Sequence, residues 1–208
     1  FTVIERAIVD KEVRNKYYNP IYYQISQGIA SIPGTALLAL LTTAIIVGLT
    51  GLQAPVWYFV TMFLALVCAE ALAQLVSHVV PHFVIGMALV AGMYGFFMLY
   101  QGFMLIPSDF PSWLRWTYNV GFHTYAWRTF MYTEFHDLGE LESPNAFATG
   151  RDVLVTYEIE NVNRRNDMFV LLGYAAVLHL LSFVVLHLRY TLFKGKVIAP
   201  TTKSGGVS

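Results

Sequence analysis

Residues 56–79 read VWYFVTMFLALVCAEALAQLVSHV and contain one charged side chain, that of Glu70. The scarcity of charge extends well beyond this stretch, because the 92 residues between Lys16 and Asp109 contain no other Asp, Glu, Lys or Arg. Charged residues make up 12% of the whole chain, whereas they make up about 25% of a typical soluble domain. Such a chain cannot cover its surface with groups that water solvates. We therefore expect lipid to surround the middle of the protein.

The apolar runs are long enough for four transmembrane helices, since a bilayer core of ~30 Å is crossed by ~20 helical residues. Gly48, Gly51 and Pro55 separate the first two runs, and Pro81 separates the second from the third. The predicted spans are residues 21–49, 56–79, 83–105 and 168–188. Pro33 removes one helical hydrogen bond and predicts a kink in the first span. The predicted fold class is an all-α polytopic membrane protein.

Basic residues are distributed unevenly along the chain. All five lysines lie in the terminal segments, residues 1–16 and 190–208, whereas residues 106–167 contain nine acidic residues and five arginines. Positively charged segments stay preferentially in the cytoplasm. We therefore expect both termini, including the tail 190–208, to be cytoplasmic and the long loop to lie outside.

Residues 1–16 predict a short amphipathic helix before the first span. Ile4, Ala7 and Ile8 fall on one helical face, and charged residues fall mostly elsewhere. The helix could rest on lipid headgroups or dock a soluble partner. Its four basic and three acidic residues favour docking, because lipid-binding helices are usually predominantly basic.

The long loop divides into two parts. Residues 106–135 are rich in aromatic residues and poor in charge, which makes them too apolar for an aqueous loop and too interrupted for a span. They indicate either a re-entrant or interfacial pair of short helices, or an aromatic belt lying flat at the headgroups. Residues 136–167 are polar and acidic, and they predict a small external subdomain with little core of its own.

No catalytic constellation is present in the sequence. It contains no Gly-x-x-x-x-Gly-Lys-Ser/Thr loop, no Gly-x-Ser-x-Gly and no His-Glu-x-x-His. His78 and His82 lack a third ligand nearby, so we expect no metal site, and His179 and His187 suggest interhelical hydrogen bonds rather than a proton relay. The net charge of zero offers no electrostatic argument for nucleic-acid binding.

Glu70 is the one ionisable carboxyl group inside a predicted span, and Gln74 lies one helical turn after it. Ala65, Ala69 and Ala73 form a neighbouring face of small residues, which allows close helix approach and favours an inward-pointing Glu70. An unpaired acid there costs ~3 kcal/mol or more. We favour a hydrogen-bonding strut between helices, and roles in substrate translocation, conformational coupling or proton coupling stay open.

The order of short motifs carries more information than any one of them. The ordered motifs are Glu5-Arg6, Lys11-Glu12, Tyr22-Tyr23, Ile32-Pro33, Gly102-Phe103-Met104, Ile106-Pro107, Trp113-Leu114-Arg115-Trp116, Tyr118, Tyr125 and Glu134-Phe135. This set resembles the ABC-2-type membrane domain of the G (White/pleiotropic-drug-resistance) subfamily of ABC transporters. Residues 70–72, 80–83 and 122–123 are most similar to plant half-transporters that export cuticular wax and cutin lipids.

The resemblance implies roles for the segments. Residues 1–16 would be the coupling helix that contacts a nucleotide-binding domain. Residues 17–105 would hold three spans and residues 168–189 the last one, as the third to sixth helices of a six-helix domain. Residues 106–135 would be re-entrant helices and residues 136–167 part of an outer lid. Disulfides found in some lids would be absent, because the only cysteine, Cys68, lies in a span.

The resemblance also implies roles for single residues. The coupling-helix residues would be Glu5, Arg6, Lys11 and Glu12. The residues facing a central substrate cavity would be Gly95, Met98 and Leu99. The valve between inner and outer cavities would be Phe103 and Met104, a softer and bulkier pair than two leucines. Glu70 and Gln74 would be polar groups beside this path.

The implied function is ATP-driven export of lipids or other hydrophobic molecules by alternating access in a homo- or heterodimer, at the plasma membrane. ATP and Mg²⁺ would bind in a nucleotide-binding domain encoded upstream in the same gene, and this chain would hold no cofactor. Two other classes stay open. One is a membrane-embedded lipid-modifying enzyme using His123 or His78, and the other is a channel or structural subunit.

Overall fold

The computed structural model describes residues 2–140 and 147–192, and within them all regular elements are helical apart from one isolated bridge between Glu140 and Thr149. The helices are α1 (Thr2–Arg14), α2 (Pro20–Thr50), α3 (Pro55–Val79), α4 (Phe83–Tyr100), the 3₁₀ turn η1 (Pro107–Asp109), α5 (Thr117–Val120), α6 (Phe122–Phe135), α7 (Gly150–Thr156) and α8 (Arg164–Leu192). The predicted all-helical class is confirmed.

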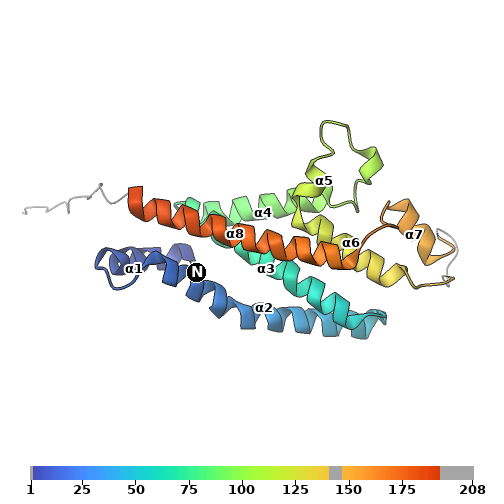
Figure 1. Ribbon diagram of the computed structural model, residues 1–208, viewed down its shortest axis with the longest axis horizontal. Helices are drawn as coiled ribbons and strands as arrows, with labels where there is room; N and C mark the ends of the chain where they lie inside the picture. Colours follow the sequence, from blue (N-terminus) through green and yellow to red (C-terminus); the bar gives the residue numbers. More distant parts are fainter. Residues whose placement is uncertain (1, 141–146, 193–208) are drawn as a thin grey trace, which may run out of the picture.

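The long helices α2, α3, α4 and α8 form an elongated bundle (Figure 1). Helix α3 is central to it and packs against the other three and against the shorter helix α6. Those long and apolar enough to cross a membrane are Pro20–Thr50, Pro55–Val79, Phe83–Tyr100 and Arg164–Thr191. The prediction of four candidate spans is therefore confirmed. Helix α4, the third candidate span, ends at Tyr100, five residues before the predicted end of that span at residue 105. The chain turns there, with Gly102 at φ 105°.

The ends of α2 follow local sequence signals. The side chain of Asn19 accepts a hydrogen bond from the backbone N–H of Ile21 at 3.2 Å, and Pro20 occupies the first turn. Gly51 ends the helix with φ 69°, a left-handed conformation that glycine adopts without strain. Pro33 lies within α2, which continues as one helix through it and curves along its length (Figure 1).

The core lies where α3 meets α8, and α4 and α6 close it on the other side. Its buried members are Cys68, Ala71, Leu72, Phe97, Phe122, Ala126, Leu171, Ala175 and Leu178. The α3 residues are mostly small, so the backbone of α8 approaches closely enough for the Cys68 thiol to donate to the carbonyl of Leu171 at 3.2 Å.

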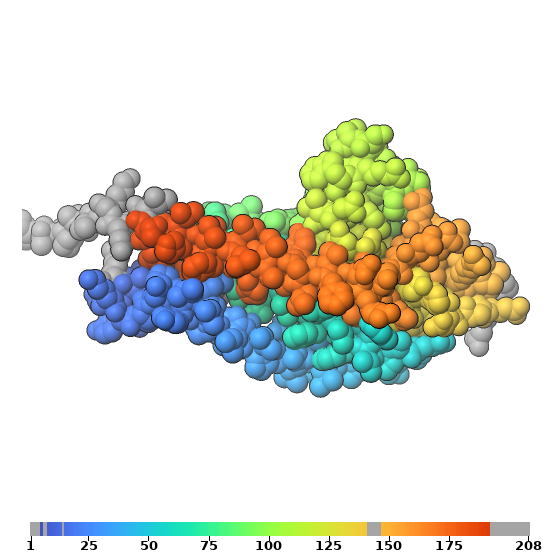
Figure 2. Space-filling model, in the orientation of Figure 1, coloured from blue at the N-terminus to red at the C-terminus, as the bar shows by residue number. Residues whose placement is uncertain are grey.

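The aromatic segment after α4 has two parts. Residues 101–120 project to one side of the bundle as a separate knob (Figure 2). Helix α6 instead packs against α3, α4 and α8 at one end of the bundle and buries Phe122 and Ala126. The short helix α7 lies against α6, and its first turn is closed by reciprocal hydrogen bonds between Thr149 and Asp152.

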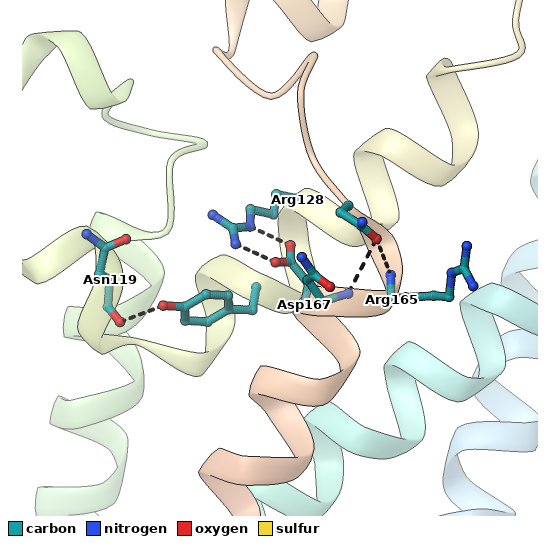
Figure 3. A network of polar contacts seen from close by, with 7 residues as sticks. Asn119, Arg128, Arg165 and Asp167 are labelled. Carbon is teal, nitrogen blue, oxygen red and sulfur yellow. Dashed lines mark hydrogen bonds and ion pairs between the residues drawn. The ribbon is translucent and has the colours of Figure 1, made fainter.

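A buried ion pair joins α6 to the start of α8 (Figure 3). The Nε and Nη2 groups of Arg128 donate to the two carboxylate oxygens of Asp167, whose side chain is only 3% exposed. The Arg128 guanidinium also lies 4.6 Å from the centre of the Tyr125 ring. Burial acts to lower the pKa of Arg128, but the hydrogen bond and charge of Asp167 outweigh it and raise that pKa.

Removing the carboxylate of this ion pair should destabilise the bundle. We expect Asp167→Ala to lower the free energy of unfolding by about 3–5 kcal/mol, because Arg128 would keep its charge without a carboxylate partner. The unfolding midpoint in a graded titration of dodecyl sulfate in mild detergent measures the effect.

The matched control is Asp137→Ala, which removes the exposed pair between Asp137 and His136. We expect a loss below about 1 kcal/mol there, since exposed ion pairs contribute little. Equal losses for the two substitutions would contradict a structural role for the buried pair.

Candidate functional site

Helix α1 is fixed to the end of the bundle where α2 begins and α8 ends. Val9 is buried, and the hydroxyl of Tyr190 donates to Asp10 at 2.7 Å. Arg189 lies 3.7 Å from the other oxygen of Asp10. Asp10, which the sequence analysis did not select, therefore provides the polar link between α1 and α8.

Two of the predicted coupling-helix residues face α2 and the turn before it. The side-chain amide of Gln27 donates to Glu5 at 3.3 Å, and the hydroxyl of Tyr18 donates to Glu12 at 2.7 Å. Burial, with the neighbouring Glu12 carboxylate, raises the pKa of Tyr18 to about 12, so this hydroxyl stays a donor at neutral pH.

The remaining coupling-helix residues do not take part in these contacts as far as the structure describes them. Lys11 is exposed, and the side chain of Arg6 lies outside the described residues. A surface hollow of about 570 Å³ lies between α1 and α2. Its lining residues are Glu5, Ile8, Val9, Glu12, Tyr18, Tyr22, Tyr23 and Ser26.

A buried polar network joins three of the membrane helices. The side-chain nitrogen of Gln24 in α2 donates to Gln74 in α3 and to Ser182 in α8, each at 3.1 Å. The side-chain oxygen of Gln24 lies 2.8 Å from Nε2 of His78. All four side chains are buried, so each polar group is satisfied by protein in a region where lipid offers no hydrogen bonds.

Glu70 lies at the edge of this network. The side-chain amide of Gln74 donates to Glu70 at 3.3 Å, within the same helix. At the other edge, Arg189 donates to the carbonyl of His78 at 3.4 Å and also approaches Asp10. Polar contacts therefore run from α1 through the end of α8 to the middle of α3.

The structure brings together residues that the sequence analysis treated separately. Glu70, Gln74 and His78 follow one another at helical spacing on α3, and the interhelical contacts come from Gln74 and His78. Gln24 and Ser182 were not selected. The signal that could have found Gln24 is an amide side chain one turn into an apolar helix, which lipid would leave unsatisfied.

The predicted cavity residues lie on an open face of α4. Met98 is 54% exposed and Leu99 is 48% exposed, and no atom lies within 4 Å of the position that a Cβ on Gly95 would take. Phe97 and Tyr94 lie on the side of α4 that packs into the core. The open face is apolar, and about half of the Met98 and Leu99 side chains is exposed.

The predicted valve pair follows this face directly. Phe103 and Met104 come after the end of α4 and are 49% and 60% exposed. They belong to residues 101–120, which follow α4 directly in the chain.

An aromatic socket, formed by Tyr118, Trp127 and Tyr157, holds the turn before the valve pair. A Cβ on Gly102 would lie 2.9 Å from Tyr118 and 3.2 Å from Trp127, so glycine is needed for this approach as well as for its φ of 105°. The Phe103 ring lies 6.3 Å from the ring of Trp127 and 6.2 Å from that of Tyr157. The socket thereby connects Phe103 to the polar segment after α7.

The described residues 2–140 and 147–192 contain no group of three His, Cys, Asp or Glu side chains placed to hold a metal ion. The recognisable features are instead a docked helix, a buried polar network and an open apolar face that ends in a constrained turn.

Comparison with known proteins places the sequence among membrane transporters. Residues 1–135 match the family model described as ABC-2 type transporter. ABC transporter G family member STR2 of Medicago truncatula is 28% identical over 186 residues, which cover 88% of this chain and 26% of that protein. ABC transporter G family member 1 of Petunia hybrida is 25% identical over 210 residues, which cover 97% of this chain and 31% of that protein.

A third relative, ABC transporter G family member 13 of Arabidopsis thaliana, is 30% identical over 128 residues, or 59% of this chain and 19% of that protein. The chain thus spans less than a third of the length of these curated relatives. Because the family model covers residues 1–135 of 208, the chain belongs to the ABC-2 type transporter family, as a membrane domain of the ABC transporter G family.

Proposed function

We propose that this chain is the transmembrane part of an ATP-driven exporter of lipids or other hydrophobic molecules, and that it forms the conduit, the valve and the outer lid in a dimer. The observation that carries the proposal is the open apolar face of α4, which ends at Phe103 and Met104. An apolar surface with adaptable side chains suits hydrophobic substrates.

The open face needs a second surface to become a conduit. A second half-transporter, either another copy or a related chain, would face Gly95, Met98 and Leu99 and enclose the path. The four candidate spans would be the third to sixth helices of a six-helix domain. Helices α5 and α6 would be the re-entrant pair, and residues 136–167 would belong to the outer lid.

Helix α1 would dock the nucleotide-binding domain. Its acidic residues are tied to α2 and α8, while Lys11 is exposed and available to a partner. ATP and Mg²⁺ would bind in that separate domain, which would supply the energy of hydrolysis. Both termini would be cytoplasmic, in agreement with the lysines of the terminal segments, and the plasma membrane would hold the protein.

The polar network would transmit movement of α1 to the conduit. Arg189 contacts both Asp10 and the end of α3, and Gln24 ties α2, α3 and α8 together. Helices joined in this way move as a unit when the docked helix moves, which is what alternating access requires.

The valve assignment is tested by substituting Phe103→Ala together with Met104→Ala in the full-length protein. We expect ATP hydrolysis to persist and the amount of lipid exported per ATP hydrolysed to fall several-fold, because the path would no longer close behind the substrate. A several-fold fall corresponds to a loss of roughly 1 kcal/mol in the free energy that couples hydrolysis to export. Reconstituted vesicles loaded with ATP and a fluorescent lipid measure both quantities.

The control is Leu180→Ala with Leu181→Ala, a pair on α8 with similar exposure that lies outside the proposed path. Export should be unchanged in this control. Unchanged export and unchanged coupling in the Phe103 and Met104 variant would refute the valve.

The aromatic socket makes a separate prediction about Gly102. We expect Gly102→Ala to cost about 1–3 kcal/mol, because alanine is strained at φ 105° and its Cβ would collide with Tyr118. Gly92→Ala is the matched control, since nothing lies within 4 Å of its Cβ position and alanine favours the helix by about 0.5–1 kcal/mol. The unfolding midpoint should fall for the first variant alone, and a fall for both would contradict the socket.

Substitutions in the polar network can show whether Glu70 acts as a hydrogen-bonding strut or as an ionised group. We expect Glu70→Gln to keep folding and export, because a glutamine oxygen still accepts from Gln74. Gln74→Leu should cost about 1–3 kcal/mol, since it leaves the buried amide of Gln24 without one acceptor. Thermal unfolding and export assays check both, and a loss of export in Glu70→Gln with an unchanged midpoint would favour an ionised role over the strut.

A further inference from the structure

A second hollow lies at the opposite end of the bundle from α1, at the boundary of two candidate spans. It has a volume of about 600 Å³. Its lining residues are Trp57, Tyr132, Val162, Asn163, Arg164 and Arg165. Trp57 lies in the first turn of α3 and Arg164 begins α8, so the hollow lies where two candidate spans begin, the level at which Trp, Tyr and Arg side chains meet lipid headgroups.

Two aromatic rings hold one of the arginines in place. The Arg164 guanidinium lies 5.1 Å from the centre of the Trp57 ring and 5.8 Å from that of Tyr132. Contacts of this kind use the flat face of the guanidinium and leave the N–H groups at its edge free to donate. Arg164 is therefore positioned without its hydrogen-bonding capacity being used up.

Neither arginine of the hollow has a carboxylate partner among the described residues, because the only ion pairs there join Arg128, His136 and Arg189 to Asp167, Asp137 and Asp10. Two carboxylates on α6 and α8 have other partners. Asp167 faces Arg128, and Glu134 accepts from the backbone of Gln53 at 3.3 Å.

The start of α8 is already capped by protein. The side chain of Asn163 accepts from the backbone N–H groups of Arg165 at 3.1 Å and of Asn166 at 3.5 Å. Figure 3 shows the Arg165 side chain pointing away from the pair of Arg128 and Asp167. The unneutralised charge at the hollow is thus that of two adjacent guanidinium groups.

An apolar strip continues from Arg165 along the same face of α8. Phe169 lies four residues after Arg165 and Leu172 three residues after that, which places all three side chains on one side of the helix. Phe169 is 70% exposed and Leu172 is also exposed. A cationic group is therefore followed along α8 by an apolar strip, in the same order as the headgroup and the acyl chain of a lipid.

We propose that this hollow binds the phosphate of a phospholipid headgroup, with Arg164 and Arg165 as donors and an acyl chain along Phe169 and Leu172. Guanidinium groups donate to phosphate oxygens in pairs. The strip favours a lipid over free phosphate. The proposal does not depend on what the protein transports.

The test measures lipid retention by the full-length protein. Native mass spectrometry in mild detergent follows the adducts formed with dioleoyl phosphatidylglycerol, dioleoylglycerol or inorganic phosphate. We expect Arg164→Ala with Arg165→Ala to weaken phosphatidylglycerol binding about tenfold or more, the loss of a paired charge-assisted contact. Dioleoylglycerol has the same chains without the phosphate, and it should bind more weakly and respond little to the substitution.

Arg151→Ala is the matched control, because Arg151 is an exposed arginine on α7 outside the hollow. The variant Arg164→Lys with Arg165→Lys keeps the charge and should retain part of the binding if the alanine variant fails to fold. An equal loss in Arg151→Ala, no loss in either double variant, or blockage of lipid binding by millimolar inorganic phosphate would overturn the proposal.

Discussion

The close contact between α3 and α8 is the constraint on which the rest of the structure depends. Apolar side chains gain nothing from leaving lipid for one another, so helices in a membrane associate through tight packing and polar contacts. Cys68 and Ala71 on α3 and Leu171 on α8 have no exposed surface, and the Cys68 thiol reaches the opposing backbone. Helices α2, α4 and α6 are then arranged around α3 as a central element.

Polar contacts fix this packed pair at both ends. At one end Gln24 joins α2 to α3 and α8, and Arg189 continues the contacts to α1. At the other end the buried pair of Arg128 and Asp167 ties α6 to α8. Van der Waals packing alone permits helices to slide or rotate, whereas buried donors and acceptors that must stay within hydrogen-bond distance of one another specify one register. The polar groups therefore define how the apolar helices are aligned.

The sequence was sufficient for the spans because the bilayer imposes a length and a composition that can be counted. It was insufficient to say which faces of the helices pack, since α4 is apolar all round and the apolar residues of α3 surround its few polar ones. Of the small residues selected in α3, Ala65 and Ala69 pack against the core but are only partly buried, whereas Cys68 and Ala71, which were not selected, are completely buried.

Two features of the candidate site, the end of α4 and the polar network at Gln24, could not be predicted from the sequence for the same reason. Helix α4 stops early because Tyr118 and Trp127, which come later in the chain, pack over Gly102. Gln24 acquires its role from Ser182, which is 158 residues away in sequence. Neither partner can be identified until the helices are placed, although the unusual residues themselves, a glycine in a turn and an amide in lipid, are visible beforehand.

The glycines of α4 provide a last argument about its open face. A glycine inside a helix costs about 0.5–1 kcal/mol relative to alanine, a cost that close packing normally offsets. Gly92 and Gly95 have no atom within 4 Å of a Cβ position, so nothing within the described chain offsets it. If this face only contacted lipid, alanine would serve there as well as glycine. Gly34 of α2 and Gly173 of α8 are equally open, so openness alone does not single out α4. What distinguishes α4 is that Gly92 and Gly95 lie one turn apart beside the flexible side chain of Met98, an adaptable apolar surface that agrees with the proposed conduit for hydrophobic substrates.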